Sequence, residues 1–415
     1  MQLLDSQSDA LHGIVNKYRL DLEPYETIYR ELHSAPELSG QEEVTSSLTA
    51  DHLRRLGFDV HANIGGYGVA GVLRNGPGPI VLLRADMDAL PMEEKTGLPY
   101  ASKRTIKNKT GTEVPVMHAC GHDAHVTGLM VSAELLHSAR ERWSGTLIII
   151  FQPAEEELSG AQAMLDDGLY DKIPKPDIVL AQHVIRMKTG TVSIRPGRLL
   201  TATDAFDVRI FGRGGHGSAP QNCIDPIVIG AAIVTRLQNI VSREITPGEL
   251  AIVSCGSIQA GHAPKIIPDH CDLKLSVRSY EPKVRKRLNA AIKRIIKAEC
   301  QASGATEKPL ITQTITSPRQ PTMKRQSRHY NLVETEAATA SEDFSLLATA
   351  VGAPYVMWLF GGIDAEKWDD AVSRDAMDEL PSNHSSFFAP AIEPTLVTAV
   401  DAMAVGALTF LKFKT

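Results

Sequence analysis

Histidine, cysteine and carboxylate side chains gather in a few short stretches of this sequence, and residues 117–125 (MHACGHDAH) hold the densest group. Three histidines, one cysteine and one aspartate lie within these nine residues. Imidazole and thiolate are ligands that zinc, manganese or cobalt take in proteins. Gly121 allows the chain to turn so that Cys120 and His122 face one point. A helix start with incidental histidines is the alternative, but the whole chain has only 14 histidines, so their crowding favours a metal site.

Carboxylates follow two predicted strands. Residues 84–91 (RADMDALP) end one apolar run, and residues 151–157 (FQPAEEE) leave the continuous apolar run 145–151 (GTLIIIF). Ligand sites in α/β sheets lie at the carboxyl ends of strands. Crowded glutamates repel one another unless a cation neutralises them, and adjacent carboxylates can divide metal binding from general-base catalysis. The alternatives are a turn with two solvated aspartates and an acidic helix start favoured by the helix dipole.

Two isolated histidines are weaker candidates. A lone histidine is usually a structural residue. His183 ends a predicted strand of the same sheet, which favours a place beside the other ligands, and His384 lies in residues 382–386 (SNHSS). Residues 66–71 and 212–217 fit G-x-G-x-x-G, but neither pattern opens a helix, so a nucleotide or redox cofactor is disfavoured.

Elements of two kinds must position these residues. Strands alternate with helices up to about residue 202, which predicts an α/β sheet covered on both faces. From residue 203 the order becomes β-α-β-β-α-β, the split βαβ of ferredoxin-like folds. The predicted segments are 206–211, 225–242, 251–258, 271–279, 281–301 and 310–315. We therefore expect a mixed-sheet catalytic domain in residues 1–202 and 317–415, with a ferredoxin-like α+β domain, residues 203–316, inserted in it.

Bulk composition narrows the function classes. The 415 residues carry a formal net charge of −6, and the closest approach to a basic run is residues 323–328, so neither nucleic acid nor an anionic membrane is expected as a partner. We see no signal peptide and no apolar stretch long enough to cross a membrane. Five scattered cysteines are typical of reduced thiols in a cytoplasmic protein.

In their order along the chain, these motifs resemble those of the M20 metallopeptidase family, and within it the aminoacylases, hippurate hydrolases and auxin-conjugate amidohydrolases. The motifs are residues 84–91, 118–123 (HACGHD), 152–156 (QPAEE), 214–218 (GGHGS) and 341–345 (SEDFS). The resemblance runs from about residue 25 to residue 410. It implies a small-molecule amide as substrate, two divalent metal ions (Zn, Mn, Co or Ni), and an inserted lid through which two copies form a homodimer.

The resemblance also implies roles for single residues. The metal ligands would be Cys120, His122, Glu156, His183 and His384, with Cys120 where related branches have a bridging aspartate. Glu155 would be the general base. Asp86 would orient the site from behind.

Three further roles fall in the predicted inserted domain. His216 would reach a substrate carbonyl, often from a partner subunit, and Arg278 would contact a substrate carboxylate. Lys265 stands where many relatives have asparagine, so it would either bind a carboxylate or lie aside. The flank of His384 also departs from the family pattern.

We therefore expect an aminoacylase-like amidohydrolase that splits N-acyl amino acids or similar small amides into a carboxylic acid and an amino acid. The alternatives are a dipeptidase or carboxypeptidase with the same metal site, or a non-catalytic metal-binding homologue.

Overall fold

The computed structural model describes residues 2–195, 197–317, 320–322, 331–333 and 340–414 of the chain. The basic run 323–328 therefore lies outside the described residues. Residues 318–319 are also outside them, and with that run they form part of segment 316–328, for which the sequence predicts the linker that returns from the inserted domain. Two units are distinguished. Unit 1 comprises Met1–Leu199, Pro321–Ala337 and Glu342–Thr415, and unit 2 comprises Leu200–Gln320 and Ala338–Ser341.

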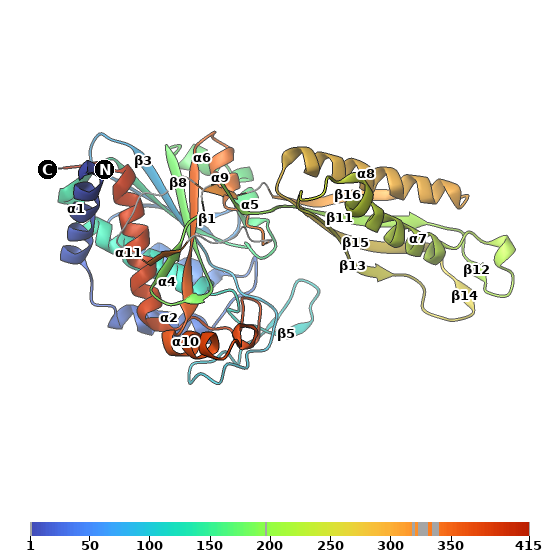
Figure 1. The fold of residues 1–415 in the computed structure, drawn as a ribbon, viewed down its shortest axis with the longest axis horizontal. Coiled ribbons are helices and arrows are strands. Elements are labelled where there is room, and N and C mark those ends of the chain that lie inside the picture. The colour runs from blue at the N-terminus through green and yellow to red at the C-terminus, as the bar shows by residue number, and fades with distance from the viewer. Residues whose placement is uncertain (1, 196, 318–319, 323–330, 334–339, 415) are drawn as a thin grey trace. The chain divides into compact units, whose positions relative to one another are not determined.

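A mixed sheet forms the centre of unit 1 (Figure 1). Its described strands, in spatial order, are β1 (Asp59–Ile64), β2 (Gly68–Arg74), β7 (Thr146–Gln152), β3 (Ile80–Asp86), β8 (Ile178–Lys188), β19 (Tyr355–Ile363), β9 (Thr191–Ser193) and β18 (Asn331–Val333). The neighbours β7, β3, β8 and β19 run parallel, so their carboxyl ends meet at one edge. β7 is buried almost throughout, as its run of β-branched residues predicts for a strand covered on both faces.

Helices cover both faces of this sheet, as the predicted fold class requires. Figure 1 shows α4 (His122–Ser138) and α11 (Ile392–Phe410) on one side and α5 (Gly160–Asp166), α6 (Leu169–Lys172) and α9 (Ser345–Thr349) on the other. α4 and α11 pack on β3 and β8, while α5 contacts β7. Among the described helices, α11 has the length and composition to cross a membrane, but 61% of its apolar window is buried, which is the pattern of a core helix.

The remaining elements of unit 1 surround this core. α1 (Gln2–Tyr18), α2 (Glu23–Ser34) and α3 (Glu43–Arg55) pack near α4, and α10 (Ala365–Ser373) contacts β8. The shorter strands of unit 1 are β4 (Thr105–Lys107), β5 (Glu113–Pro115), β6 (Trp143–Ser144) and β20 (Lys412–Phe413). Two more, β10 (Gly197–Leu200) and β17 (Gln320–Thr322), each contain residues of both units. The sequence did not predict β1, β19 or α1, whose form depends on the neighbours they pair with or pack on.

Unit 2 has the predicted ferredoxin-like form. Its antiparallel sheet has the order β13 (Ala251–Gln259), β15 (His270–Ser279), β11 (Ala202–Phe211) and β16 (Leu310–Ser317). α7 (Pro226–Asn239) and α8 (Pro282–Ala302) pack on the face that Phe206, Val208 and Ile210 present. α7 begins where predicted, because the Asp225 side chain accepts a hydrogen bond from the Ile227 amide and proline occupies the first helical position.

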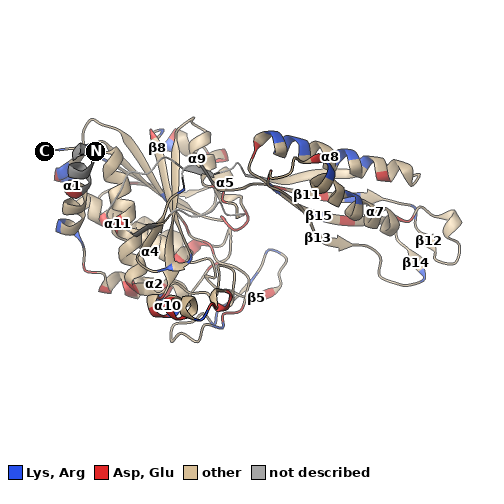
Figure 2. Ribbon diagram, viewed as in Figure 1, with Lys and Arg blue, Asp and Glu red and all other residues tan. Residues whose placement is uncertain are grey.

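Lysine and arginine residues recur along α8 (Figure 2). Several are paired within unit 2: Arg294 with Glu244 at 2.6 Å and Lys283 with Glu249 at 2.6 Å. These pairs belong to the charged, solvated face of the helix.

Candidate metal centre

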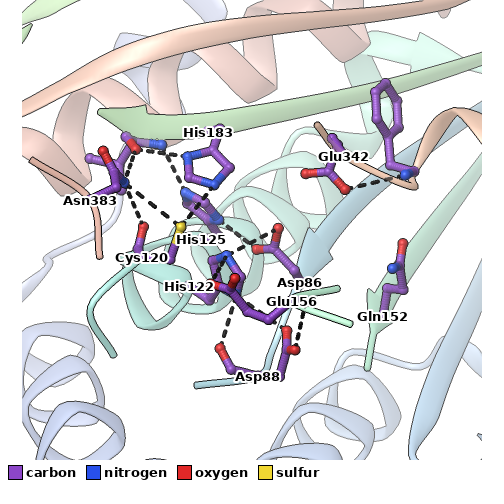
Figure 3. Close-up of polar contacts among 12 residues, drawn as sticks. Asp86, Asp88, Cys120, His122, His125, Gln152, Glu156, His183, Glu342 and Asn383 are labelled. Carbon is purple, nitrogen blue, oxygen red and sulfur yellow. Dashed lines mark hydrogen bonds and ion pairs between the residues drawn. The ribbon is translucent and has the colours of Figure 1, made fainter. Parts of the chain in front are cut away.

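The five side chains expected to bind metal converge beyond the carboxyl edge of the unit 1 sheet. Figure 3 shows four of them: Cys120, His122, Glu156 and His183. The Nε2 atom of His384 lies 3.3 Å from Sγ of Cys120 and 3.4 Å from Oε2 of Glu156. The Nε2 atom of His183 lies 3.5 Å from the same sulfur. The Nε2 atom of His122 lies 3.9 Å from Oε1 of Glu156. Four separate parts of the sequence, at residues 120–122, 156, 183 and 384, therefore supply donor atoms to one small region.

Gly121 makes the approach of Cys120 and His122 possible. It has a φ of +84° and caps the start of α4. A Cβ atom at this position would lie 2.4 Å from a methyl group of Val184. Glycine tolerates both the left-handed backbone and the close packing. The turn inferred from the sequence is thus present, with one donor before the glycine and one after it.

Asn383 holds the segment that carries His384, a role that we did not predict from the sequence. Its Nδ2 atom donates hydrogen bonds to the carbonyl oxygens of Cys120 and Val184, both at 3.0 Å. His384 itself has a left-handed φ of +66°, and its amide donates to the Ala119 carbonyl at 2.8 Å. Strained backbone of this kind persists only where the surroundings hold it. The unusual flank of His384 therefore has a structural function. The only sign of this function in the sequence was the position of Asn383 next to a candidate ligand.

Two histidines aim Nε2 at the centre while Nδ1 is bonded to a carbonyl oxygen. Nδ1 of His122 lies 2.9 Å from the Asp88 carbonyl oxygen, and Nδ1 of His183 lies 2.7 Å from the Val184 carbonyl oxygen. A carbonyl oxygen only accepts hydrogen bonds, so each Nδ1 carries the proton in the neutral ring. Metal-binding histidines in proteins have this second hydrogen bond as a rule.

Buried atoms without hydrogen-bond partners indicate which kind of ion the donor cluster could bind. Nε2 of His122 and Oε1 of Glu156 are buried and have no hydrogen-bond partner among the described residues. Leaving such atoms unsatisfied costs about 1–3 kcal/mol each. A thiolate, a carboxylate and three imidazoles form a donor set suited to zinc-like divalent ions. The residues present therefore fit the metal pair that the sequence motifs predict.

His125 lies in the same cluster but has both ring nitrogens occupied. Its Nδ1 lies 2.5 Å from Oδ1 of Asp86, and its Nε2 accepts the Val184 amide at 2.8 Å. Oδ2 of Asp86 accepts from Arg84 at 2.7 Å and lies 3.6 Å from Nε2 of His122. Burial opposes the charge of Asp86, but His122 and Arg84 outweigh it and lower the pKa of this carboxyl. Asp86 thus lies behind the donor cluster, where an orienting carboxylate was expected.

Glu155 is buried beside the donors and is 5% exposed. Its carboxylate lies within 4.8 Å of donor atoms of His122 and Glu156, and in a second group within 4.8 Å of Asp86 and Glu342. Burial and the charges of Glu342 and Glu156 raise the pKa of Glu155 well above its usual value. A carboxylate with a raised pKa holds a proton more readily, which suits a general base.

A buried guanidinium offsets the acidic groups around Glu155. Arg84 bonds Glu342 at 2.8 Å, Asp86 at 2.7 Å and Oε1 of Gln152 at 2.9 Å. Gln152 also donates to Asp343 at 2.6 Å. In the sequence Arg84 stands out only as part of the motif in residues 84–91. The network around it was therefore not predicted. The opposite charges of Arg84 and of the acidic pair in residues 342–343 were its only signal.

The candidates in unit 2 lie at different places within that unit. His216, in β12 (Gly215–His216), pairs with β14 (Ile266–Ile267), and the Gly217 amide bonds the Lys265 carbonyl at 2.8 Å. His216 and Lys265 are therefore neighbours, and both are exposed.

Arg278 lies elsewhere. It is next to the last residue of β15, and its Nη1 donates to Ser341 at 3.3 Å. The β12–β14 ribbon joins the sheet at the other end of β15, where the Gly212 amide bonds the Asp269 carbonyl. At about 3.4 Å per residue, roughly 27 Å of strand separate the two ends. A single copy of unit 2 therefore cannot bring Arg278 and His216 to one small substrate.

Comparison with known proteins shows a match to a peptidase family and to named hydrolases. Residues 82–381 match the sequence profile of peptidase family M20/M25/M40. The chain is 42% identical over 289 residues to a hippurate hydrolase of Campylobacter jejuni, a match that covers 68% of this chain and 72% of that protein. It is 37% identical over 348 residues to thermostable carboxypeptidase 1 of Saccharolobus solfataricus, covering 80% of this chain and 86% of that protein.

A solved structure has the same fold. The YXEP protein of Bacillus subtilis, described as a dinuclear metal binding peptidase from the M20 family, superposes with a TM-score of 0.70 at 24% identity. The superposition covers 93% of this chain and 98% of that one. At this identity the likeness shows the fold.

Proposed function

We propose a two-metal amidohydrolase function for this chain, which belongs to peptidase family M20/M25/M40. The chain is a hydrolase of the amidohydrolase type, and we assign it N-acyl amino acids or similar small amides as substrates. The observation that carries this proposal is the convergence of Cys120, His122, Glu156, His183 and His384 beside the buried carboxylate of Glu155. The dinuclear centre named for the YXEP protein supports a pair of ions here.

The chain's own residues would divide the reaction among them. When bound, the two cations polarise the amide carbonyl and lower the pKa of the attacking water. Glu155 accepts a proton from that water and transfers it to the leaving amine nitrogen. Asp86 holds the His122 side of the centre through its charge. His216 donates a hydrogen bond to the substrate carbonyl oxygen, a contact worth roughly 3–4 kcal/mol in other hydrolases.

The substrate would carry a free carboxylate next to the scissile amide. Hippurate is N-benzoylglycine, and a carboxypeptidase also releases an amino acid with a free carboxylate. Both kinds of relative therefore share this chemistry. Arg278 and Lys265 are our candidate contacts for it. The carboxypeptidase relative favours a second candidate function, the removal of C-terminal residues from short peptides.

We also propose that two copies pair through unit 2, the inserted lid. Apolar side chains on its surface support this: Val228 is 63% exposed, Ile227 42% and Ile258 51%. Pairing would let His216 of one copy serve the centre of the other. We further propose a cytoplasmic location, which the five free cysteines support.

The activity test uses the full-length protein. The protein is treated with chelator, dialysed, and reloaded with Zn²⁺, Mn²⁺, Co²⁺ or Ni²⁺. Hydrolysis of N-benzoylglycine, N-acetyl amino acids, dipeptides and amides without a carboxylate is then followed by release of the amine. We expect metal-dependent turnover of the acyl amino acids and a loss of about 10²–10⁴-fold in kcat for Glu155→Gln. Turnover at the wild-type rate by Glu155→Gln would refute the general-base role, and preference for dipeptides would favour the second candidate.

The pairing test mixes two inactive variants, His216→Ala and Glu155→Gln. If His216 acts across subunits, a mixed dimer has one intact centre, and about a quarter of the activity returns at equal mixing. Analytical ultracentrifugation of the same samples reports the association state. No recovery in a confirmed dimer would place His216 within its own chain.

A further inference from the structure

The turn that presents Glu155 has a strained backbone. Ala154, immediately before it, has a left-handed φ of +49°. The Ala154 carbonyl accepts the amides of Ser159 and Gly160 at 3.2 Å and 3.1 Å, which closes a tight loop. A Cβ atom on Gly160 would lie 1.5 Å from the Pro153 carbonyl oxygen, so only glycine fits there. A non-glycine residue keeps such a conformation only where surrounding groups enforce it.

Glu42, at the start of α3, binds the amide of Ala154, the residue before Glu155. Its Oε1 atom accepts hydrogen bonds from the Ala154 amide at 2.8 Å and from the Gly40 amide at 2.9 Å. The side chain is buried, and its Oε2 atom has no hydrogen-bond partner among the described residues. Burying a carboxylate costs free energy because it loses its water. A glutamate that only began a helix would lie in solvent, so the burial of Glu42 indicates another role.

Asp88 holds the peptide group after Glu155. Its Oδ2 atom accepts the Glu156 amide at 2.9 Å and the Ser39 hydroxyl at 2.6 Å. Asp88 is the second aspartate of the motif in residues 84–91, and Ser39 and Glu42 belong to one short stretch of the sequence. The amides of Ala154 and Glu156, the residues before and after Glu155, are therefore both bonded to buried carboxylates. Neither of these hydrogen bonds involves the Glu155 side chain.

We propose that Glu42 and Asp88 are positioning residues for Glu155, each holding one flanking peptide amide so that the carboxylate faces the metal centre. The proposal rests on the hydrolase function proposed above. Neither residue is a candidate metal ligand. Their effect is on the geometry of the base, and a displacement of about 1 Å at such a group lowers turnover by about 10²-fold.

The test compares variants at two adjacent glutamates. Glu42→Leu removes the acceptor for the Ala154 amide, and Glu42→Gln keeps a carbonyl oxygen there. Burial and Asp88 raise the pKa of Glu42 to about 7, so a neutral side chain at this position is a fair substitute near neutral pH. Glu43→Leu is the matched control, because Glu43 is the next residue, is exposed, and loses the same charge. Ser39→Ala weakens the Asp88 side alone.

Two readouts are made on the metal-loaded protein. For Glu42→Leu we expect kcat to fall by about 10²-fold with KM changed less than about threefold and metal content unchanged. Hydrogen exchange followed by mass spectrometry should be faster in the peptide covering residues 153–158 and unchanged in the strands of unit 2. Glu42→Gln and Glu43→Leu should behave as the wild type, and Ser39→Ala should show a smaller change in the same direction.

Unchanged kcat and exchange in Glu42→Leu would overturn the proposal, as would equal losses in the Gln and Leu variants. If Glu42→Leu does not fold, Ser39→Ala decides alone, and wild-type exchange in residues 153–158 then counts against the proposal. Failure of the proposed function is a separate result. In that case the wild type cleaves none of the amides, while the exchange data still report whether the turn is held.

Discussion

The sulfur of Cys120 lies 3.3 Å from Nε2 of His384, although 264 positions separate the two residues in the chain. Asn383 stabilises this contact by bonding the Cys120 carbonyl oxygen. The two donors are neighbours only in the folded unit 1, because nothing local in the sequence relates them. Metal affinity and folding of unit 1 should therefore be linked.

Replacing the thiol tests the first donor. Cys120→Ala removes the sulfur of the donor cluster. Donor atoms of His183, His384 and Glu156 lie close to this sulfur. We expect the bound metal, measured by elemental analysis after dialysis, to fall by at least one of two ions per chain. Cys223→Ala is the control, since that free cysteine lies in unit 2. Full occupancy in Cys120→Ala would remove it from the ligand set.

Metal removal should lower thermal stability. The buried, unsatisfied atoms of His122 and Glu156 gain partners only when cations bind. Ligand present at about 1,000 times its dissociation constant stabilises a native protein by about 4 kcal/mol. We expect the chelated protein to melt at a lower temperature and Zn²⁺ or Mn²⁺ to restore the midpoint. Cys120→Ala should respond less, and identical melting with and without metal would contradict the linkage.

The Arg84 network should dominate the stability of the sheet edge. Arg84→Met leaves Glu342 and Asp86 buried without their shared cation, and breaking a buried ion pair in this way costs about 3–5 kcal/mol. Urea denaturation should show this as a lower midpoint. Arg54→Met, at a side chain 52% exposed, should change the free energy of unfolding by less than about 0.5 kcal/mol. Equal effects of the two changes would show that the network adds nothing.

His33 should make stability depend on pH. Its Nδ1 lies 2.6 Å from Asp123 and its Nε2 lies 3.0 Å from Glu94, both buried. Burial disfavours the charged ring, but hydrogen bonds to Asp123 and Glu94 outweigh it and raise the pKa of His33 to about 10 from 6.5.

Because the folded pKa is the higher one, this stabilisation is complete below about pH 6.5 and is lost as the pH rises through about 10. The urea midpoint should therefore fall between about pH 7 and pH 10, and fall less in His33→Gln. His216→Gln, at an exposed histidine, is the control and should follow the wild type. Parallel curves for wild type and His33→Gln would exclude His33 as the cause.

The sequence by itself determined the chemistry of the donors and the two kinds of fold, because both are local signals. Ligand types in residues 117–125 and 151–157 are read directly, and the buried run of β7 and the proline-capped start of α7 follow from neighbouring residues. Tertiary structure alone decided which side chains meet. β19 becomes a strand through its place between β8 and β9, and the Arg84 and Asn383 contacts join segments that no local pattern relates. The same holds for Glu42 and Asp88, the carboxylates that bind the amides next to Glu155. The sequence shows their residue types, but their hydrogen bonds are long-range contacts that exist only in the folded unit 1.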